Sequence, residues 1–259
     1  MRTRIPAHPG EGRDPVPAPG TGGTILSHSS SIWAPAFAGV SGGLSGSQLL
    51  RLLTWLSPAF PVGAFGYSHG LEQAIRDGAA TSAARLTTWI AALVEHGSGW
   101  TDAVLLKAAW TAAGDSAALT EIAELADALA VSAERRRETL AQGEAFLTAA
   151  RPWTTATPED SVAYPVAVGA VAGRMGVPIE ATLTAWLHAF CANLVSVAVR
   201  AVPLGQTAGV AVIAGLEPVI LAAAARAATS TLDDLGSAAL LSDIAAMRHE
   251  TLQPRLFIS

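Results

Sequence analysis

The chain has 259 residues, 51% of them hydrophobic and 14% charged, and its formal net charge is −5. This length suffices to bury a sizeable core, and the acidic balance excludes the basic stripe that a nucleic-acid surface needs. The single cysteine, Cys191, excludes an intramolecular disulfide framework and a zinc site of four cysteines.

Residues 1–46 differ from the rest of the chain because they are rich in proline, glycine and serine and show no apolar period. This composition predicts a disordered extension. The continuous apolar core of a secretory signal does not follow the basic start. Composition alone also supports the hypothesis that these residues are translated upstream sequence and that the functional start lies near Ser47. The structured domain is expected to span residues 47–259.

The first helix and the connector after it are the most distinctive part of the sequence. A leucine-rich helix over residues 49–56 should end before Pro58. Residues 57–72 then read SPAFPVGAFGYSHGLE. Proline fixes φ and glycine permits a positive φ, so this block predicts a rigid, irregular connector. A short helix over residues 71–76 should follow, stopped by Gly78.

The connector also contains the pattern G-x-S-x-G at Gly66, Ser68 and Gly70, which is typical of the nucleophile elbow of a serine hydrolase. A triad in the matching order is available as Ser68, Asp243 and His249. An elbow needs a strand before its serine, and the prolines upstream do not suit a central strand. The serine hydrolase is therefore an alternative that depends on a sheet, and we expect no catalytic residue in a helical fold.

Helix start and stop signals recur through the rest of the chain, whereas strand signals are almost missing. The expected helices are residues 82–96, residues 101–113, an element from Asp115 to Pro152 with a break near Ser132, one starting at Thr157, one from Pro178 to Pro203, residues 208–225 and residues 235–249. The sequence therefore predicts an all-α fold, a single-domain bundle of roughly eight to ten helices.

The apolar run over residues 208–225 is long enough to span a bilayer. Glu217 and Pro218 fall in its middle, however, and a carboxylate is costly at that depth. We expect a buried helix of a soluble domain, and a small helical membrane protein is the second alternative. The only basic run, Arg135 to Arg137, is expected to form a solvated helix face.

The candidates for metal binding are few. His188 and Cys191 lie three residues apart and could form half a site, but their apolar surroundings favour a core histidine beside a buried thiol. His249 near the C-terminus is a weak candidate for transient metal contact, and a surface ion pair is the default expectation there. We expect no stably bound cofactor.

Residues 248–257 read RHETLQPRLF and alternate charge with leucine and phenylalanine. Such a segment is typical of a docking tail, and we expect it to be unable to bury Leu256 and Phe257 on its own. Folding on binding would then give a switchable contact. The residues alone therefore indicate an interaction protein.

Four blocks of the chain, in order, resemble the urease accessory protein F (UreF) family. They are residues 57–72, residues 164–169 (YPVAVG), residues 193–207 with the pattern NLVS, VR and VPLGQT, and residues 243–251 with DIA and MRHET. Together they span about residues 49–257. Residues 1–46 have no counterpart in this resemblance.

The resemblance implies an all-helical, non-catalytic protein that acts in the cytoplasm as a scaffold for the maturation of urease, a nickel enzyme. Members of the family form homodimers and bind urease accessory protein D, called H in some organisms. That complex recruits the GTPase accessory protein G, which carries nickel, and meets apo-urease. Nickel is cargo in this scheme, and neither a membrane nor a nucleic acid is a partner.

The resemblance also implies roles for particular residues. The segment that orders on binding protein D corresponds to residues 248–257, with the partner-binding candidates Arg248, His249, Glu250, Arg255, Leu256 and Phe257. The structural signature residues are Pro58, Pro61, Gly63, Phe65, Ser68, Gly70, Glu72, Pro203, Gly205 and Gln206. Among these, the connector from Pro58 to Gly66 and the turn from Pro203 to Thr207 are expected to shape the dimer surface or the surface facing protein D. The chain departs from the family pattern at residues 252–254 and at Ile258.

Overall fold

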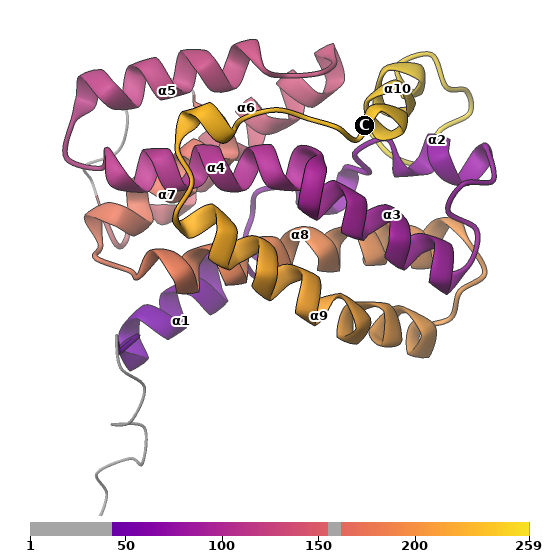
Figure 1. Ribbon diagram of the computed structural model, residues 1–259, viewed down its shortest axis with the longest axis horizontal. Helices are drawn as coiled ribbons and strands as arrows, with labels where there is room; N and C mark the ends of the chain where they lie inside the picture. Colours follow the sequence, from indigo (N-terminus) through magenta and orange to yellow (C-terminus); the bar gives the residue numbers. More distant parts are fainter. Residues whose placement is uncertain (1–42, 155–161, 259) are drawn as a thin grey trace, which may run out of the picture. The chain divides into compact units, whose positions relative to one another are not determined.

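The computed structural model describes residues 43–154 and 162–258, and every regular element in these two ranges is helical (Figure 1). The helices are α1 (Gly46–Trp55), α2 (Leu71–Arg76), α3 (Ala83–His96), α4 (Ser98–Thr111), α5 (Ser116–Ala128), α6 (Ala133–Ala150), α7 (Tyr164–Arg174), α8 (Ile179–Ala201), α9 (Gln206–Ala228) and α10 (Leu240–His249), with 3-10 turns η1 (Ala64–Gly66) and η2 (Leu232–Asp234). The all-α prediction is confirmed for these residues. The expected extension, residues 1–46, lies outside them up to residue 42.

Helix starts follow the side chains that satisfy the free amides of a first turn. Ser45, two residues before the expected boundary at residue 47, caps α1 in a capping box with Gln48. Ser82, Asp115 and Ser132 cap α3, α5 and α6, and each accepts a backbone N–H of the first turn. The predicted break near Ser132 is confirmed, because α5 and α6 are separate helices.

Two boundaries differ from the prediction. The fourth helix begins at Ser98 rather than at residue 101, since Gly97 alone separates it from α3 and Gly99 lies inside α4. The last helix begins at Leu240 rather than at residue 235, because the preceding residues turn through η2 and an extended stretch. The helix start predicted at Thr157 lies outside the described residues.

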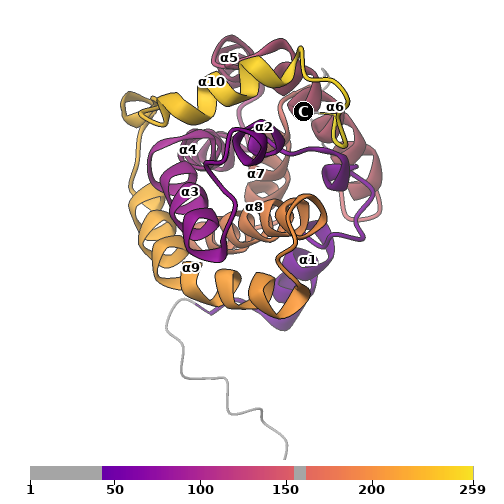
Figure 2. The same cartoon turned by 90° about the vertical axis from the view of Figure 1, so that its right-hand side faces the viewer.

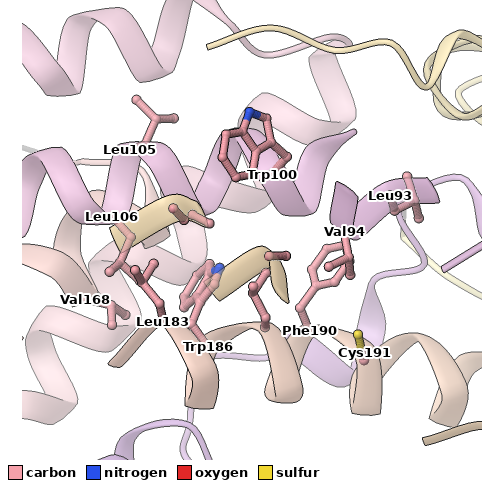
Figure 3. Close-up of a cluster of buried hydrophobic side chains, with 14 of the residues drawn as sticks. Leu93, Val94, Trp100, Leu105, Leu106, Val168, Leu183, Trp186, Phe190 and Cys191 are labelled. Carbon is pink, nitrogen blue, oxygen red and sulfur yellow. The ribbon is translucent and has the colours of Figure 1, made fainter. Parts of the chain in front are cut away.

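Helices α7 and α8 form the interior of the bundle (Figure 2). Every residue of α7 from Pro165 to Ala172 is buried. The close-up shows side chains of α3, α4, α7 and α8 meeting in one apolar cluster that includes Trp100, Leu183 and Phe190 (Figure 3). This cluster is continuous with the rest of the core, so the described residues from α1 onward form one unit.

Two glycines set the distance between α4 and α7. A Cβ on Gly169 would lie 2.2 Å from the carbonyl oxygen of Leu106, and one on Gly173 would lie 2.4 Å from the carbonyl oxygen of Trp110. Both obstacles are backbone atoms, which cannot rotate away. The pattern of two glycines four residues apart therefore lets two helix backbones approach more closely than any side chain would allow.

Two helices are long and apolar enough to cross a membrane by length and composition: α8, with a mean hydropathy of 1.5, and α9, with 2.0. This test is also passed by core helices of soluble proteins. The most apolar part of α8 is 56% buried, as in a core helix, but that of α9 is only 33% buried. The prediction that α9 is a buried helix is therefore wrong for most of its surface, since only one side faces the core.

Candidate functional site

The connector and α10 meet at a turn that only glycine fits. Gly63 and Gly70 have φ values of 74°, and His69 has a φ of 52°. A Cβ on Gly70 would lie 2.6 Å from the backbone nitrogen of Ala246 on α10. The turn before α2 therefore packs directly against α10, although Gly70 and Ala246 are about 175 residues apart in sequence.

The hydrolase alternative is contradicted by this arrangement. No strand precedes Ser68 anywhere in the described residues, and its side chain is fully buried, with Oγ 3.5 Å from the backbone nitrogen of Glu72 as a helix cap. Asp243 accepts a hydrogen bond from Ser237, and His249 lies between two glutamates. The three residues of the candidate triad therefore do not form a charge relay.

His249 is the centre of a buried cluster rather than a surface residue. Its side chain has no exposed area. Its Nδ1 lies 2.9 Å from Oε2 of Glu134 on α6, and its Nε2 lies 3.2 Å from Oε2 of Glu72 on α2. The expectation of an exposed His249 that makes transient metal contact is therefore wrong, because both ring nitrogens are occupied.

The same two glutamates hold the C-terminal tail, which we define as residues 250–258. The backbone amides of Leu256 and Phe257 donate to Glu72 at 2.8 and 3.0 Å. Arg255 donates to Oε1 of Glu134. Arg76 on α2 donates to two tail carbonyls, those of Gln253 and Pro254. Glu72, Glu134 and Arg76 thus hold the tail in place.

The aromatic end of the tail is buried, contrary to the sequence-based expectation. Phe257 is 4% exposed, whereas Leu256 is 73% exposed. The guanidinium of Arg200 lies 3.5 Å from the ring centre of Phe65 and 4.6 Å from that of Phe257. The amide of Ile258 donates to the carbonyl of Gly66. The tail, the connector and the end of α8 are therefore joined by one cation–π stack.

The exposed partner-binding candidates lie around this buried centre. Arg248 forms a surface ion pair with Asp77, with Nη1 2.9 Å from Oδ2. Glu250 accepts the backbone N–H of Glu134. The connector prolines Pro58 and Pro61 are exposed or half-buried at the bend between α1 and η1.

The turn before α9 contains the remaining signature residues. Pro203 and Gly205 are exposed, Gly205 has a φ of 22°, and Gln206 is the first residue of α9. Nothing in the described contacts ties these three residues to the tail. They shape the sharp reversal between α8 and α9 instead.

A second buried charge cluster replaces the solvated face expected for the basic run. Arg135 donates to Asp102 at 2.9 Å and lies 2.8 Å from Glu138, which also contacts His69. Burial raises the pKa of Asp102, although the charge of Arg135 opposes that shift. Arg136, paired with Asp127, and Arg137 lie at the surface as predicted, so only the first arginine of the run departs from the prediction. The first arginine is therefore a core residue.

Cys191 and His188 do not form half of a metal site. Cys191 is buried, and this burial raises the pKa of its thiol to about 12, whereas His188 is exposed. Within residues 43–154 and 162–258, no group of three or more His, Cys, Asp or Glu side chains is placed to hold a metal ion. The described part of the chain therefore contains no assembled group of metal ligands.

Two apolar surfaces remain uncovered. The first, which we call the α10 face, consists of Leu240, Leu241, Ile244 and Met247. The second, which we call the α1 groove, opens into a cavity of about 1040 Å³ between α1, the connector, α8 and α9. Its exposed apolar residues are Leu49, Leu53, Phe65 and Leu221, and Leu50 is exposed next to them on α1. Patches of this kind mark sites of protein–protein contact.

The fold and the site together define a helical protein with buried polar clusters that hold its own segments and with two exposed apolar faces. The sequence model of the UreF family matches residues 80–217. The chain is 54% identical over 217 residues to urease accessory protein UreF 1 of Brucella canis, covering 82% of this chain and 95% of that protein. It is also 54% identical to urease accessory protein UreF of Agrobacterium fabrum over 216 residues, covering 82% and 97%, and to that of Rhizobium etli over 214 residues, covering 82% and 96%.

The chain belongs to the UreF family of urease accessory proteins. This membership supports a role in the maturation of urease, and the names of the relatives describe accessory proteins rather than enzymes.

Proposed function

We propose that this chain is a non-catalytic scaffold that binds urease accessory protein D (or H) and a second copy of itself, and that the resulting complex recruits the nickel-carrying GTPase, accessory protein G, to apo-urease. The observation that carries the proposal is the pairing of a pinned C-terminal tail with two separate apolar faces. A scaffold needs two such faces, because each partner has to be held without displacing the other.

The α10 face and the tail suit accessory protein D. Leu241 on α10 is 74% exposed, and Leu256 in the C-terminal tail is 73% exposed. A cavity of about 560 Å³ between α3 and the start of α10 adjoins Leu241 and contains Trp89. Large exposed apolar side chains beside a pocket are typical of interface hot spots. The rim is polar, since Arg85 and Thr88 line the same cavity.

The α1 groove suits a second copy of the chain. Leu50 and Leu53 are 66% and 61% exposed on a short amphipathic helix, and Phe65 is 62% exposed on the adjoining connector. In an isologous dimer the same surface patch is used on both subunits, so one apolar groove on the chain is sufficient to form the dimer interface. This placement leaves the α10 face free, which allows both contacts in one complex.

Nickel is proposed to travel with the partners as cargo rather than to reside in this chain. The absence of an assembled ligand group from the described residues supports that view. The cytoplasm is the proposed location, because urease maturation as implied by the family takes place there.

The first test is co-expression with accessory protein D, followed by size-exclusion chromatography with light scattering. We expect a heteromer whose mass corresponds to two copies of each chain. Deletion of residues 250–259 should abolish co-elution with protein D and leave the far-ultraviolet circular dichroism of the helices unchanged. Retained co-elution after the deletion would show that the tail is not part of the interface.

A matched pair of variants separates the two faces. Leu241→Asp with Met247→Asp should abolish binding to protein D and preserve the self-association of the chain. Leu50→Asp with Leu53→Asp should do the reverse. All four leucine and methionine side chains are at least 48% exposed, so their replacement creates no buried charge. Loss of both contacts in either variant would contradict the assignment of separate faces.

A further inference from the structure

The contacts of His249 require one more proton than a neutral histidine supplies. Its Nδ1 and Nε2 lie 2.9 and 3.2 Å from carboxylate oxygens of Glu134 and Glu72. A neutral imidazole has one N–H and one lone pair, and an ionised carboxylate only accepts. Both contacts are hydrogen bonds only when the ring is doubly protonated or one of the two carboxyl groups is protonated.

The charges around the ring favour the doubly protonated imidazole. Glu72 and Glu134 together carry two negative charges, and Arg255 supplies one positive charge to Glu134. With a protonated His249, the net charge of the four side chains is zero. The glutamates are 6% exposed and the histidine has no exposed area, so an unbalanced charge there would lack the solvation of water.

Loss of this proton would act on the tail, because the same carboxylates hold it. Glu72 accepts the amides of Leu256 and Phe257, and Glu134 accepts from Arg255. Without the extra proton, a ring lone pair would face a carboxylate oxygen at hydrogen-bond distance. That repulsion is relieved by separating α10 and the tail from α2 and α6.

We propose that Glu72, His249 and Glu134 form a proton-dependent clamp, in which the docked tail binds one more proton than the released tail. Rising pH then favours release, since the state that binds fewer protons gains relative stability. For one linked proton, the docking equilibrium falls by up to about tenfold per pH unit above the transition. The consequence for binding to accessory protein D rests on the proposed function, whereas the proton linkage is a property of the free chain.

The other charged groups that face the clamp make contacts that do not depend on an added proton. Arg76 on α2 binds the carbonyls of Gln253 and Pro254, and Arg255 belongs to the tail itself. Glu250 at the end of α10 accepts the backbone N–H of Glu134. Arg248 pairs with Asp77 on the outside. None of these contacts needs a proton to be added, so His249 and its two glutamates are the switching groups.

Hydrogen exchange of the full chain tests the clamp directly, because the amides of Leu256 and Phe257 are protected by Glu72. Protection factors of the segment 250–258, corrected for intrinsic exchange, are measured from pH 6 to pH 9. We expect them to fall with rising pH, by up to about tenfold per pH unit, while those of α7 stay constant. A pH-independent protection of the tail would overturn the proposal.

Glu134→Gln is the matched variant. Its amide N–H₂ can donate to the lone pair of His249 Nδ1, and its carbonyl can still accept from Arg255, so the clamp closes without the extra proton. We expect a protected tail with no pH slope. A slope that persists in Glu134→Gln would overturn the proposal, as would loss of the slope in the control variant Asp127→Asn, which changes only the surface partner of Arg136. Failure of accessory protein D to bind would leave these results unaffected and would count against the proposed function alone.

Discussion

Gly169→Ala tests the packing of α4 against α7. The new Cβ would lie 2.2 Å from the carbonyl oxygen of Leu106 and 3.1 Å from the Cβ of Ala109. Because the first obstacle is backbone, the two helices must separate. Overpacking of this kind costs about 1–3 kcal/mol, and the better helix propensity of alanine offsets about 1 kcal/mol. We expect the upper half of that range, and therefore a net loss of about 1–2 kcal/mol in the free energy of unfolding.

Gly215→Ala is the control for this substitution. Gly215 is an exposed helical residue of α9 with no atom within 4 Å of an added Cβ. Here only the propensity term acts, and stability should rise by up to about 1 kcal/mol. Urea unfolding followed by circular dichroism at 222 nm measures both variants. If Gly169→Ala were as stable as Gly215→Ala, the close approach of α4 and α7 would not be what excludes a side chain.

Two further predictions follow from the buried polar and thiol groups. Arg135→Met leaves two buried carboxylates without their shared cation, and it should lower the free energy of unfolding by about 3–5 kcal/mol. The same change at the exposed Arg136 should have no measurable effect in the same urea titration. Equal effects at the two positions would contradict the assignment of Arg135 to the core. Cys191, whose pKa is raised to about 12 by burial, should not react with a thiol reagent at pH 8 in the native protein and should react promptly in guanidinium chloride. Rapid labelling of the native chain would show that the core face of α8 opens on the timescale of the assay.

Much of the helical framework could be predicted from local sequence signals. Ser82, Asp115 and Ser132 identify helix starts because a capping side chain acts within three residues of its own position. The boundaries that were missed, at Ser98 and Leu240, depend on contacts with distant residues. For example, a Cβ on Gly97, between α3 and α4, would lie 2.8 Å from the Cβ of Ala239, a close approach that no local pattern reveals.

The candidate site was predicted less completely. The alternation of charge and apolar side chains over residues 248–257 predicts a docking tail, but it does not predict the burial of Phe257 and His249. Arg200, which lies against the rings of Phe65 and Phe257, was missed because nothing around it marks it for that role. Glu72 was noted only as part of the connector signature, although it holds two amides of the tail.

The sequence by itself determined the all-α class, most helix boundaries and the family, because capping, periodicity and the connector pattern are local properties of the chain. Only the tertiary structure decided which charges are buried and paired. His249, Glu72 and Glu134 come from α10, α2 and α6, and Arg135 meets a carboxylate of α4. The charges of these buried side chains depend on their partners and on their removal from water, and neither is visible in the local sequence. In the histidine cluster, both partners of His249 lie more than 100 residues away along the chain.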